Sequence, residues 1–215
     1  MSEIEYELYG LKHIQGVTAL LLNSFRVEEP LNVCLNLSLE DSSEVFRGLA
    51  EECAKEPLSF VAIDKATGKI VGCRLSSPKL RGAKPYKPPN ASQVVKKIEN
   101  IFYLLDVLQG DLFTDIPEAD KVLKFEIVSV DKNFQRRGIA QKLIDLTIEN
   151  AVKRGFDHVT VTATSFKTQE LFHKKLGFKT IRTIELEHFD VNGKKPFGHI
   201  PNHNSVAKFM AKKIN

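Results

Sequence analysis

Apolar residues recur along the first part of the chain at spacings that separate helices from strands. Residues 4–9 are expected to form a short strand, and residues 14–25 a helix, because apolar side chains recur there every three or four positions. Pro30 ends this helix just after Glu28 and Glu29, since proline cannot continue a helix interior. The apolar face of the helix is formed by Ile14, Val17, Leu21 and Phe25, widened by Leu20 and Leu22.

The middle of the chain predicts a helix, a hairpin, a loop and a second helix, in that order. A helix over residues 41–53 is expected to begin at Asp41, which is its candidate cap. Residues 58–76 are typical of a hairpin of two apolar strands. Four prolines predict a surface loop over residues 77–90, and residues 92–109 predict an amphipathic helix.

The second half of the chain alternates strands and helices. Strands are expected over residues 122–130, 158–163 and 180–187, and helices over 138–154 and 167–176. The last segment, residues 205–214, is consistent with a strand and equally with a helix, because alanine and lysine are frequent in it. This order predicts a mixed α/β sheet with helices on both faces. No linker separates the halves, so a single domain over residues 1–215 is expected.

The composition is that of a globular protein with an ordinary core. Of 215 residues, 42% are hydrophobic and 27% are charged, which excludes a disordered or fibrous chain. The net charge of +4 is modest and the basic residues are scattered, whereas nucleic-acid binders concentrate positive charge on one face. We therefore expect no nucleic-acid partner, and the small excess of positive charge favours an anionic small ligand.

Cysteine usage and the N-terminus bear on the compartment. Cys34, Cys53 and Cys73 form no CxxC pair, which argues against disulfide bonds and fits a reducing compartment. Residues 1–5 are acidic, where a signal peptide would be basic and then apolar. No stretch approaches the roughly 20 apolar residues that span a bilayer. The expectation is a cytoplasmic protein with no membrane partner.

The segment from Val128 to Ala140 carries the most informative chemistry. A β-rich run ends there, and a helix opens with Arg136, Arg137 and Gly138 at its start. The first amides of a helix have no intrahelical acceptor and the helix dipole is positive there, so such an end binds anions. A glycine at this point lets the backbone approach a phosphate closely. Both the Walker pattern GxxxxGK[ST] and the dinucleotide pattern GxGxxG are absent.

The pattern Gln135-x-x-Gly138-x-Ala140 resembles the Q/R-x-x-G-x-G/A signature of the GCN5-related N-acetyltransferases (GNAT), although alone it is also typical of a basic helix start. A strand over residues 159–163 and a helix ending in Leu176-Gly177-Phe178 are similar to the other half of that family's cofactor core. The resemblance implies the GNAT fold, an α/β (α+β) fold with a mixed, mostly antiparallel central sheet. It also implies acetyl-CoA as co-substrate, with its pyrophosphate on the loop amides. The implied coenzyme contacts are Val128, Val130, Gln135, Arg136, Arg137, Gly138, Ile139, Ala140, Ser165 and Lys174.

A narrower resemblance lies in the segment Phe25-Arg26-Val27-Glu28-Glu29-Pro30-Leu31-Asn32. It is similar to the (D/E)-E-P-L segment of insect-type arylalkylamine N-acetyltransferases, whose glutamate before the proline is the proposed general base, here Glu29. A primary amine has a pKa of about 10 and arrives protonated, so a group must take its proton. The charge of Glu28 is expected to raise the pKa of Glu29. The alternative interpretation is that both glutamates only begin a helix.

The departing CoA thiolate needs a proton, and two residues are candidates for giving it. Ser165 matches a serine proposed to act in the arylalkylamine enzymes, although the second serine of that pair is Gln169 here. His173 lies where many GNAT enzymes have a tyrosine, four residues before the glycine of Gly-Phe. Each has a simpler interpretation, since Ser165 is also a candidate helix cap and His173 a residue that only covers the sheet.

Together these residues predict an N-acetyltransferase that acts by direct attack on the primary amine of a small molecule, with an arylalkylamine favoured. The alternatives are the same reaction on polyamines, amino acids or protein amines, a CoA-binding module without turnover, and a nucleotide-binding protein. No metal is expected, because Pro201 prevents a regular helix between His199 and His203. A monomer and a homodimer are both consistent with the sequence.

Overall fold

The computed structural model describes residues 2–82 and 95–215, which form one seven-stranded sheet. The strands are β1 (Ile4–Leu8), β2 (Phe60–Asp64), β3 (Lys69–Leu80), β4 (Lys121–Val130), β5 (His158–Ala163), β6 (Lys179–Glu185) and β7 (Val206–Lys213). Their order across the sheet is β1-β2-β3-β4-β5-β7-β6. The described strands pair antiparallel except for β4 and β5, which are parallel. The mixed, mostly antiparallel sheet expected from the sequence is confirmed.

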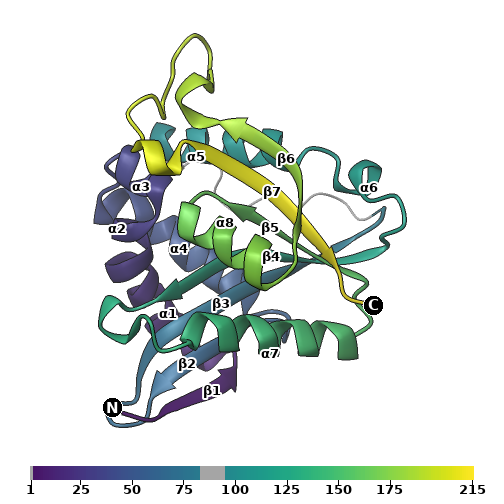
Figure 1. Ribbon diagram of the computed structural model, residues 1–215. Coiled ribbons are helices and arrows are strands. Elements are labelled where there is room, and N and C mark those ends of the chain that lie inside the picture. The colour runs from purple at the N-terminus through teal and green to yellow at the C-terminus, as the bar shows by residue number, and fades with distance from the viewer. Residues whose placement is uncertain (1, 83–94) are drawn as a thin grey trace.

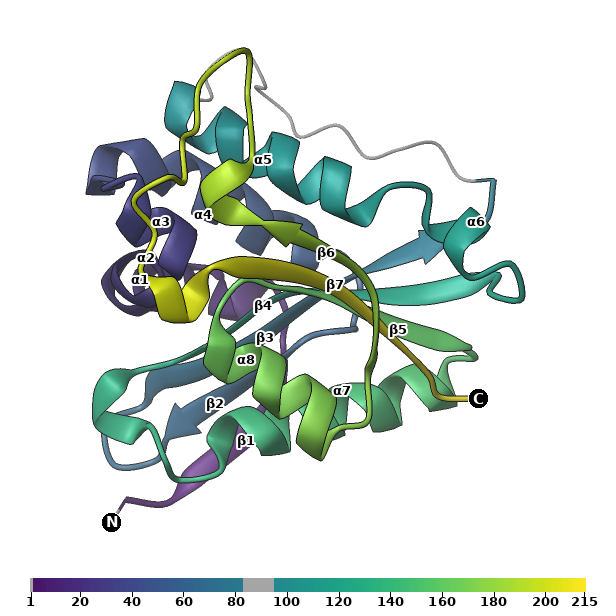
Figure 2. The same ribbon diagram turned by 45° about the horizontal axis from the view of Figure 1, so that its top comes forward.

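Helices cover both faces of this sheet, as expected (Figure 1). The helices are α1 (Ile14–Leu20), α2 (Arg26–Glu28), α3 (Pro30–Cys34), α4 (Leu39–Cys53), α5 (Lys96–Gln109), α6 (Leu112–Asp115), α7 (Ile139–Lys153) and α8 (Phe166–Glu170). Figure 2 shows α7 and α8 in a layer below the sheet and α5 and α6 in a layer above it. In the part of the chain that the structure describes, no helix is long and apolar enough to cross a membrane.

Each face of the sheet has its own buried apolar cluster. On one face Ile144 and Ala151 of α7 pack with Phe125 of β4. On the other, Val17 of α1 and Phe46 of α4 belong to one cluster. The apolar stripes predicted from helical spacing are therefore the sides of these helices that contact the sheet.

The strands β4 and β5 separate part-way along their length. Their parallel pairing runs from Val122 opposite His158 to Phe125 opposite Val161, although both strands continue beyond these residues. On the other edge of β4, Leu75 pairs with Ile127 and Ser76 with Phe125, so Glu126 is the extra residue of a β-bulge. Such a bulge bends the strand and leaves an unpaired residue. The result is an opening between β4 and β5 beyond Phe125.

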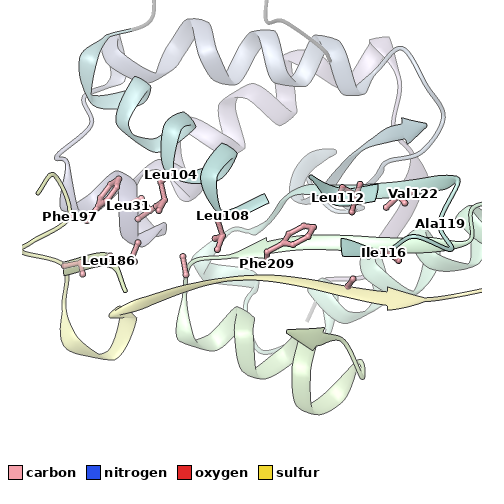
Figure 3. Close-up of a cluster of buried hydrophobic side chains, with 13 residues drawn as sticks. Leu31, Leu104, Leu108, Leu112, Ile116, Ala119, Val122, Leu186, Phe197 and Phe209 are labelled. Carbon is pink, nitrogen blue, oxygen red and sulfur yellow. The ribbon is translucent and has the colours of Figure 1, made fainter. Parts of the chain in front are cut away.

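A buried cluster on the α5 side of the sheet fixes the short helix α3 (Figure 3). Leu31 of α3 is 1% exposed and lies in this cluster with Leu104, Phe197 and Phe209. Burial of a leucine side chain contributes roughly 1.5–3 kcal/mol. Because Leu31 comes two residues after Glu29, this packing also fixes the backbone of Glu29.

Three expectations about local structure need correction or completion. The helix over 41–53 begins earlier, because Ser38 is its cap and Asp41 makes the reciprocal bond to the Ser38 N–H. Residues 77–80 are not loop but the end of β3, where Pro78 pairs with Leu123. Of the rest of the expected loop, only Arg81 and Gly82 are described. The remainder of that loop and residues 92–94 of the expected helix lie outside the described residues. The ambiguous C-terminal segment is a strand, β7.

Candidate active site

A cavity of about 1530 Å³ includes the opening between β4 and β5. Its wall is formed by both strands beyond their last pair and by side chains of α4 and α5. Six of the residues predicted from the sequence line it, namely Glu29, Val128, Val130, Gln135, Ala140 and Ser165. The structure thus brings the Glu-Glu-Pro segment, the β4 strand and the start of α8 to one cavity.

Glu29 lies at the start of α3 with both carboxylate oxygens engaged. Its Oε2 accepts a hydrogen bond from the Asn32 N–H at 2.7 Å, and its Oε1 accepts one from Thr164 Oγ1 at 2.7 Å. Burial raises the pKa of the Glu29 carboxyl, and these two donors oppose the rise because they favour the ionised form. A raised pKa brings a carboxylate closer to the range in which it exchanges protons near neutral pH.

Glu28 contributes to the site in a different way from the one expected. The pKa of Glu29 is raised as predicted, but the cause is burial and not the charge of Glu28. The exposed Glu28 side chain instead accepts a hydrogen bond from Gln135 Nε2 at 2.8 Å. Gln135 Nε2 also lies 3.2 Å from the Val130 carbonyl oxygen, to which it donates. The two sequence motifs, 107 residues apart, are therefore joined by a direct contact.

The loop that follows β4 leads into a helix without a side-chain cap. Asp131 accepts from the Asn133 N–H and shapes the first turn. Arg136 and Gly138 then adopt left-handed backbone conformations, with φ of 59° and 76°. Gly138 is the N-cap of α7 and makes no side-chain bond to the helix amides. Within residues 2–82 and 95–215, these amides therefore have no side-chain acceptor, as an anion site requires.

The two arginines and the isoleucine of this loop differ in their surroundings. Arg136 is exposed beside the helix start. Arg137 donates to the Ser2 carbonyl oxygen at 2.5 Å, and its guanidinium lies 5.1 Å from the centroid of the Phe134 ring. Ile139 is 2% exposed and packs in the core below α7. Of the three, Arg136 has the side chain that is freely available to an anion.

Ser165 begins α8 and also lines the cavity. Its Oγ accepts from the Thr168 N–H at 3.2 Å, which makes it the cap that the simpler interpretation predicts. Its hydroxyl also lies 2.7 Å from Thr168 Oγ1, to which it donates. Ser165 therefore has a structural role at the helix start and a position in the cavity wall.

The comparisons with known proteins agree with this geometry. Residues 113–189 match the acetyltransferase (GNAT) domain family. The structure is similar to arylalkylamine N-acetyltransferase 2 from Aedes aegypti, with 27% identity, a TM-score of 0.80, and coverage of 99% of this chain and 100% of that one. The chain is an acyltransferase, and the match to the GNAT family covers residues 113–189 of it.

Two further solved structures share the fold of the acyltransferase. One is a polyamine N-acetyltransferase from Drosophila melanogaster that forms N-acetylagmatine, with 18% identity, a TM-score of 0.79, and coverage of 98% of this chain and 100% of that one. The other is the C-terminal condensation domain of Ebony in complex with β-alanyl-dopamine, with 21% identity, a TM-score of 0.82, and coverage of 99% and 100%.

Like Arg136, Arg137, Gly138 and Ile139, the last two predicted site residues of the acyltransferase are not part of the cavity wall. His173 is exposed, and its Nδ1 donates to the Phe178 carbonyl oxygen at 3.2 Å. Lys174 is exposed and forms an ion pair with Glu170. Both lie in the π-helical turn Leu171–Lys175 that extends α8, and Leu171 and Phe172 are the residues of that turn that line the cavity. The geometry does not bring His173 to the reaction centre.

Sequence reasoning missed two residues that hold Glu29. Thr164 follows β5 directly and reaches Glu29 across the opening. Asn32 is 5% exposed, lines the cavity and donates its backbone N–H to the Glu29 carboxylate. The signal for Asn32 was its place three residues after a candidate cap, whereas Thr164 carried no local signal because its partner is 135 residues away.

Proposed function

We propose that the acyltransferase moves an acetyl group from acetyl-CoA to the primary amine of an arylalkylamine-type small molecule, by direct attack with Glu29 as general base. One observation carries this proposal. The half-buried carboxylate of Glu29 lines the same cavity as the β4 edge and Ala140 in the first turn of the uncapped helix α7. A proton acceptor and an anion site that share one cavity are what a transfer between an amine and a phosphate-bearing acyl donor needs.

The donor half of the cavity fits acetyl-CoA. The free amides at the start of α7, with Arg136 beside them, supply positive potential for the pyrophosphate. The opening beyond Phe125 offers β4 backbone that is not paired with β5, to which an amide-rich arm can bind. In this arrangement the acyl group lies near Val128 and Val130. An N–H of this part of β4 then stabilises the charge that develops on the carbonyl oxygen.

Glu29 takes the proton of the attacking amine. A carboxylate with its ordinary pKa is a weak base, and burial makes Glu29 a stronger one. The two hydrogen bonds from Asn32 and Thr164 hold the carboxylate in one orientation, which pre-organises the proton transfer. Ser165 is the candidate donor of a proton to the departing thiolate, because its hydroxyl lies in the cavity wall.

The acceptor half of the cavity supports an aryl group on the amine. Phe25, Phe46 and Phe102 contribute aromatic side chains to the wall, and the Phe25 and Phe46 rings pack edge to face with centroids 5.8 Å apart. Aromatic walls bind aromatic ligands through area and ring geometry. The similar Aedes aegypti enzyme is an arylalkylamine N-acetyltransferase, which favours the same class of acceptor here.

The test is a binding measurement followed by an amine panel on the wild-type protein. Calorimetry with CoA and acetyl-CoA comes first, and release of free thiol is then followed with tyramine, tryptamine, agmatine, spermidine, tyrosine and a short peptide. Turnover with tyramine and tryptamine at higher kcat/KM than with the other amines is expected. Binding of the coenzyme without thiol release from any amine contradicts the proposal and supports a non-catalytic CoA-binding module. Absence of coenzyme binding contradicts the assignment of the α7 site as well.

A further inference from the structure

Arg74 is a charged residue in the middle of the sheet that the proposed reaction does not use. It lies on β3, is 1% exposed and forms part of the cavity wall. Among the residues that the structure describes, no carboxylate lies within ion-pair distance of Arg74. The negative charge of Glu126, which pairs with Lys124, still acts on Arg74 and raises its pKa. Burial nevertheless lowers the pKa of Arg74 to about 9, which still leaves it charged at neutral pH.

The guanidinium of Arg74 spans the bulge in β4. Nη1 donates to the Ile127 carbonyl oxygen at 2.6 Å and to the Leu75 carbonyl oxygen at 2.9 Å. These carbonyls belong to the last pair before the register shifts at Glu126. The guanidinium also stacks on the Phe125 ring, 3.6 Å from its centroid. One side chain thus holds the β3 and β4 backbones at the pair next to the bulged residue, and it packs on the Phe125 ring on the other side of the bulge.

The remaining donors of the guanidinium have no hydrogen-bond partner among the described residues. Nε and Nη2 are buried and make no hydrogen bond with the described residues, and neither does Ser76 Oγ, two residues further along β3. A buried donor without a partner costs on the order of 1–3 kcal/mol, and more when it is charged. Methionine or leucine fills such a position without this penalty. A residue that carries this energetic penalty is expected where it contributes to the reaction and not to the stability of the fold.

We propose that Arg74 is a positioning residue for acyl transfer. It fixes the bulged backbone of β4, and through it the N–H groups that face the acyl carbonyl, and it brings a buried positive charge to this part of the sheet. This inference rests on the proposed function and adds to it a residue outside the expected site. Because the transition state carries the developing negative charge, Arg74 contributes mainly to kcat and little to coenzyme affinity.

Two variants separate charge from shape. Arg74→Met removes the charge and the hydrogen bonds but keeps most of the volume, and Arg74→Lys keeps the charge but not the two-carbonyl contact. For Arg74→Met we expect kcat to fall roughly 10- to 100-fold, less than the loss of a direct oxyanion donor, with the KM for acetyl-CoA changed less than about threefold. Arg74→Lys is expected to recover part of kcat. Equal losses in kcat and coenzyme affinity, or no loss of kcat, overturn the proposal.

Arg182→Met is the matched control. Arg182 also donates to a carbonyl oxygen, that of Leu108 at 2.8 Å, and it pairs with Asp115. It lies outside the cavity wall. Its replacement is expected to lower the melting temperature without changing kcat. A fall in kcat of the same size as in Arg74→Met attributes the effect to general stability and overturns the proposal.

A second measurement does not depend on turnover. Amide hydrogen exchange of residues 127–130 is compared in the wild type, Arg74→Lys and Arg182→Met. Faster exchange in β4 for the Arg74 variant alone supports the clamp on the bulge, and unchanged exchange overturns it. The exchange measurement tests the contact of Arg74 with β4 even if no amine is turned over. Absence of turnover contradicts the proposed function, so the two failures can be told apart. If Arg74→Met does not fold, the exchange measurement can still be made on the conservative variant Arg74→Lys.

Discussion

Two of the helices that begin at the cavity, α3 and α7, meet the same backbone requirement in different ways. At α3 the protein supplies its own acceptor, because Glu29 accepts from the Asn32 N–H. At α7 the cap is Gly138, which has no side chain to offer. The first amides of every helix need an acceptor from outside the helix. In our proposal a start left without a cap in the wall of a cavity keeps its amides for a ligand, whereas a start capped by a carboxylate uses that carboxylate within the protein.

Glu29 combines the two roles in our proposal, because it caps α3 and also acts as the general base. A cap normally holds its charge by hydrogen bonding, which lowers the pKa. In Glu29 burial outweighs the hydrogen bonds and the pKa is raised. The carboxylate of Glu29 is therefore held in place by its cap contacts and still remains a better base than an exposed glutamate.

The largest effect is expected for Glu29→Gln. An amide can keep both contacts, accepting from Asn32 through its oxygen and donating to Thr164 through its nitrogen, so the start of α3 is preserved. The proton acceptor is lost, and kcat/KM is expected to fall roughly 10²- to 10⁴-fold. Steady-state thiol release measures this, and calorimetry is expected to show unchanged acetyl-CoA affinity. Retained activity removes Glu29 from the mechanism.

The same variant has a stability signature with a definite sign. Since burial raises the pKa of Glu29 above its ordinary value of 4.5, ionisation of the carboxyl disfavours the folded state. The stability associated with the protonated carboxyl is present below pH 4.5 and is lost as pH rises through the folded pKa. Glu29→Gln is therefore expected to be more stable than the wild type at pH 8 and not at pH 4, by urea unfolding. Asp111→Asn, at the exposed cap of α6, is the control, and its activity is expected to stay unchanged.

A smaller effect is expected at the uncapped start, for Gly138→Ala. The added Cβ meets no atom within 4 Å, so the penalty comes from the left-handed φ of 76°. That conformation costs an alanine roughly 1–2 kcal/mol. If the turn relaxes to avoid it, the amides lose their alignment, and the KM for acetyl-CoA is expected to rise about tenfold with little change in kcat.

Gly155→Ala tests whether this effect belongs to the site. Gly155 follows the other end of α7, has a φ of 72° and also leaves its Cβ position open. Both variants are expected to lose similar amounts of stability in urea unfolding. A rise in KM for acetyl-CoA in Gly138→Ala but not in Gly155→Ala places the coenzyme at the start of α7. Equal KM values in both variants remove the anion site from that helix end.

The sequence predicted the positions of the helices and strands better than it predicted the contacts between them. Period and glycine positions located α7 and β5 to within a residue or two, because a helix stripe and a buried strand are local patterns. The cap of α4 was misplaced from Ser38 to Asp41, since both residues of a capping box are good caps. The bulge at Glu126 and the buried Arg74 were not foreseen. Register and burial depend on residues far apart in the chain, which no local window contains.

A further prediction concerns the acid limb of the pH profile. Thr164 Oγ1 donates to Glu29 and favours its ionised form, so Thr164→Val is expected to raise the pKa of Glu29 further. The acid limb of kcat/KM then moves to higher pH, and activity falls several-fold near pH 6 while it is nearly retained near pH 9. Thr114→Val removes a similar bond from Thr114 to Asp111 outside the cavity and is expected to leave the profile unchanged. A downward shift contradicts the role of Thr164.

The smallest effect on activity is expected where a helix start is fully satisfied and lies away from the cavity wall. Ser38 caps α4, accepting from the Asp41 N–H at 3.0 Å, and Asp41 accepts in return from the Ser38 N–H at 2.9 Å. Ser38→Ala is expected to lower the free energy of unfolding by about 1 kcal/mol. kcat and both KM values are expected to stay within experimental error, because no ligand takes the place of this cap. A loss of activity in Ser38→Ala that matches the loss in Gly138→Ala means that the distinction between capped and uncapped starts does not govern binding.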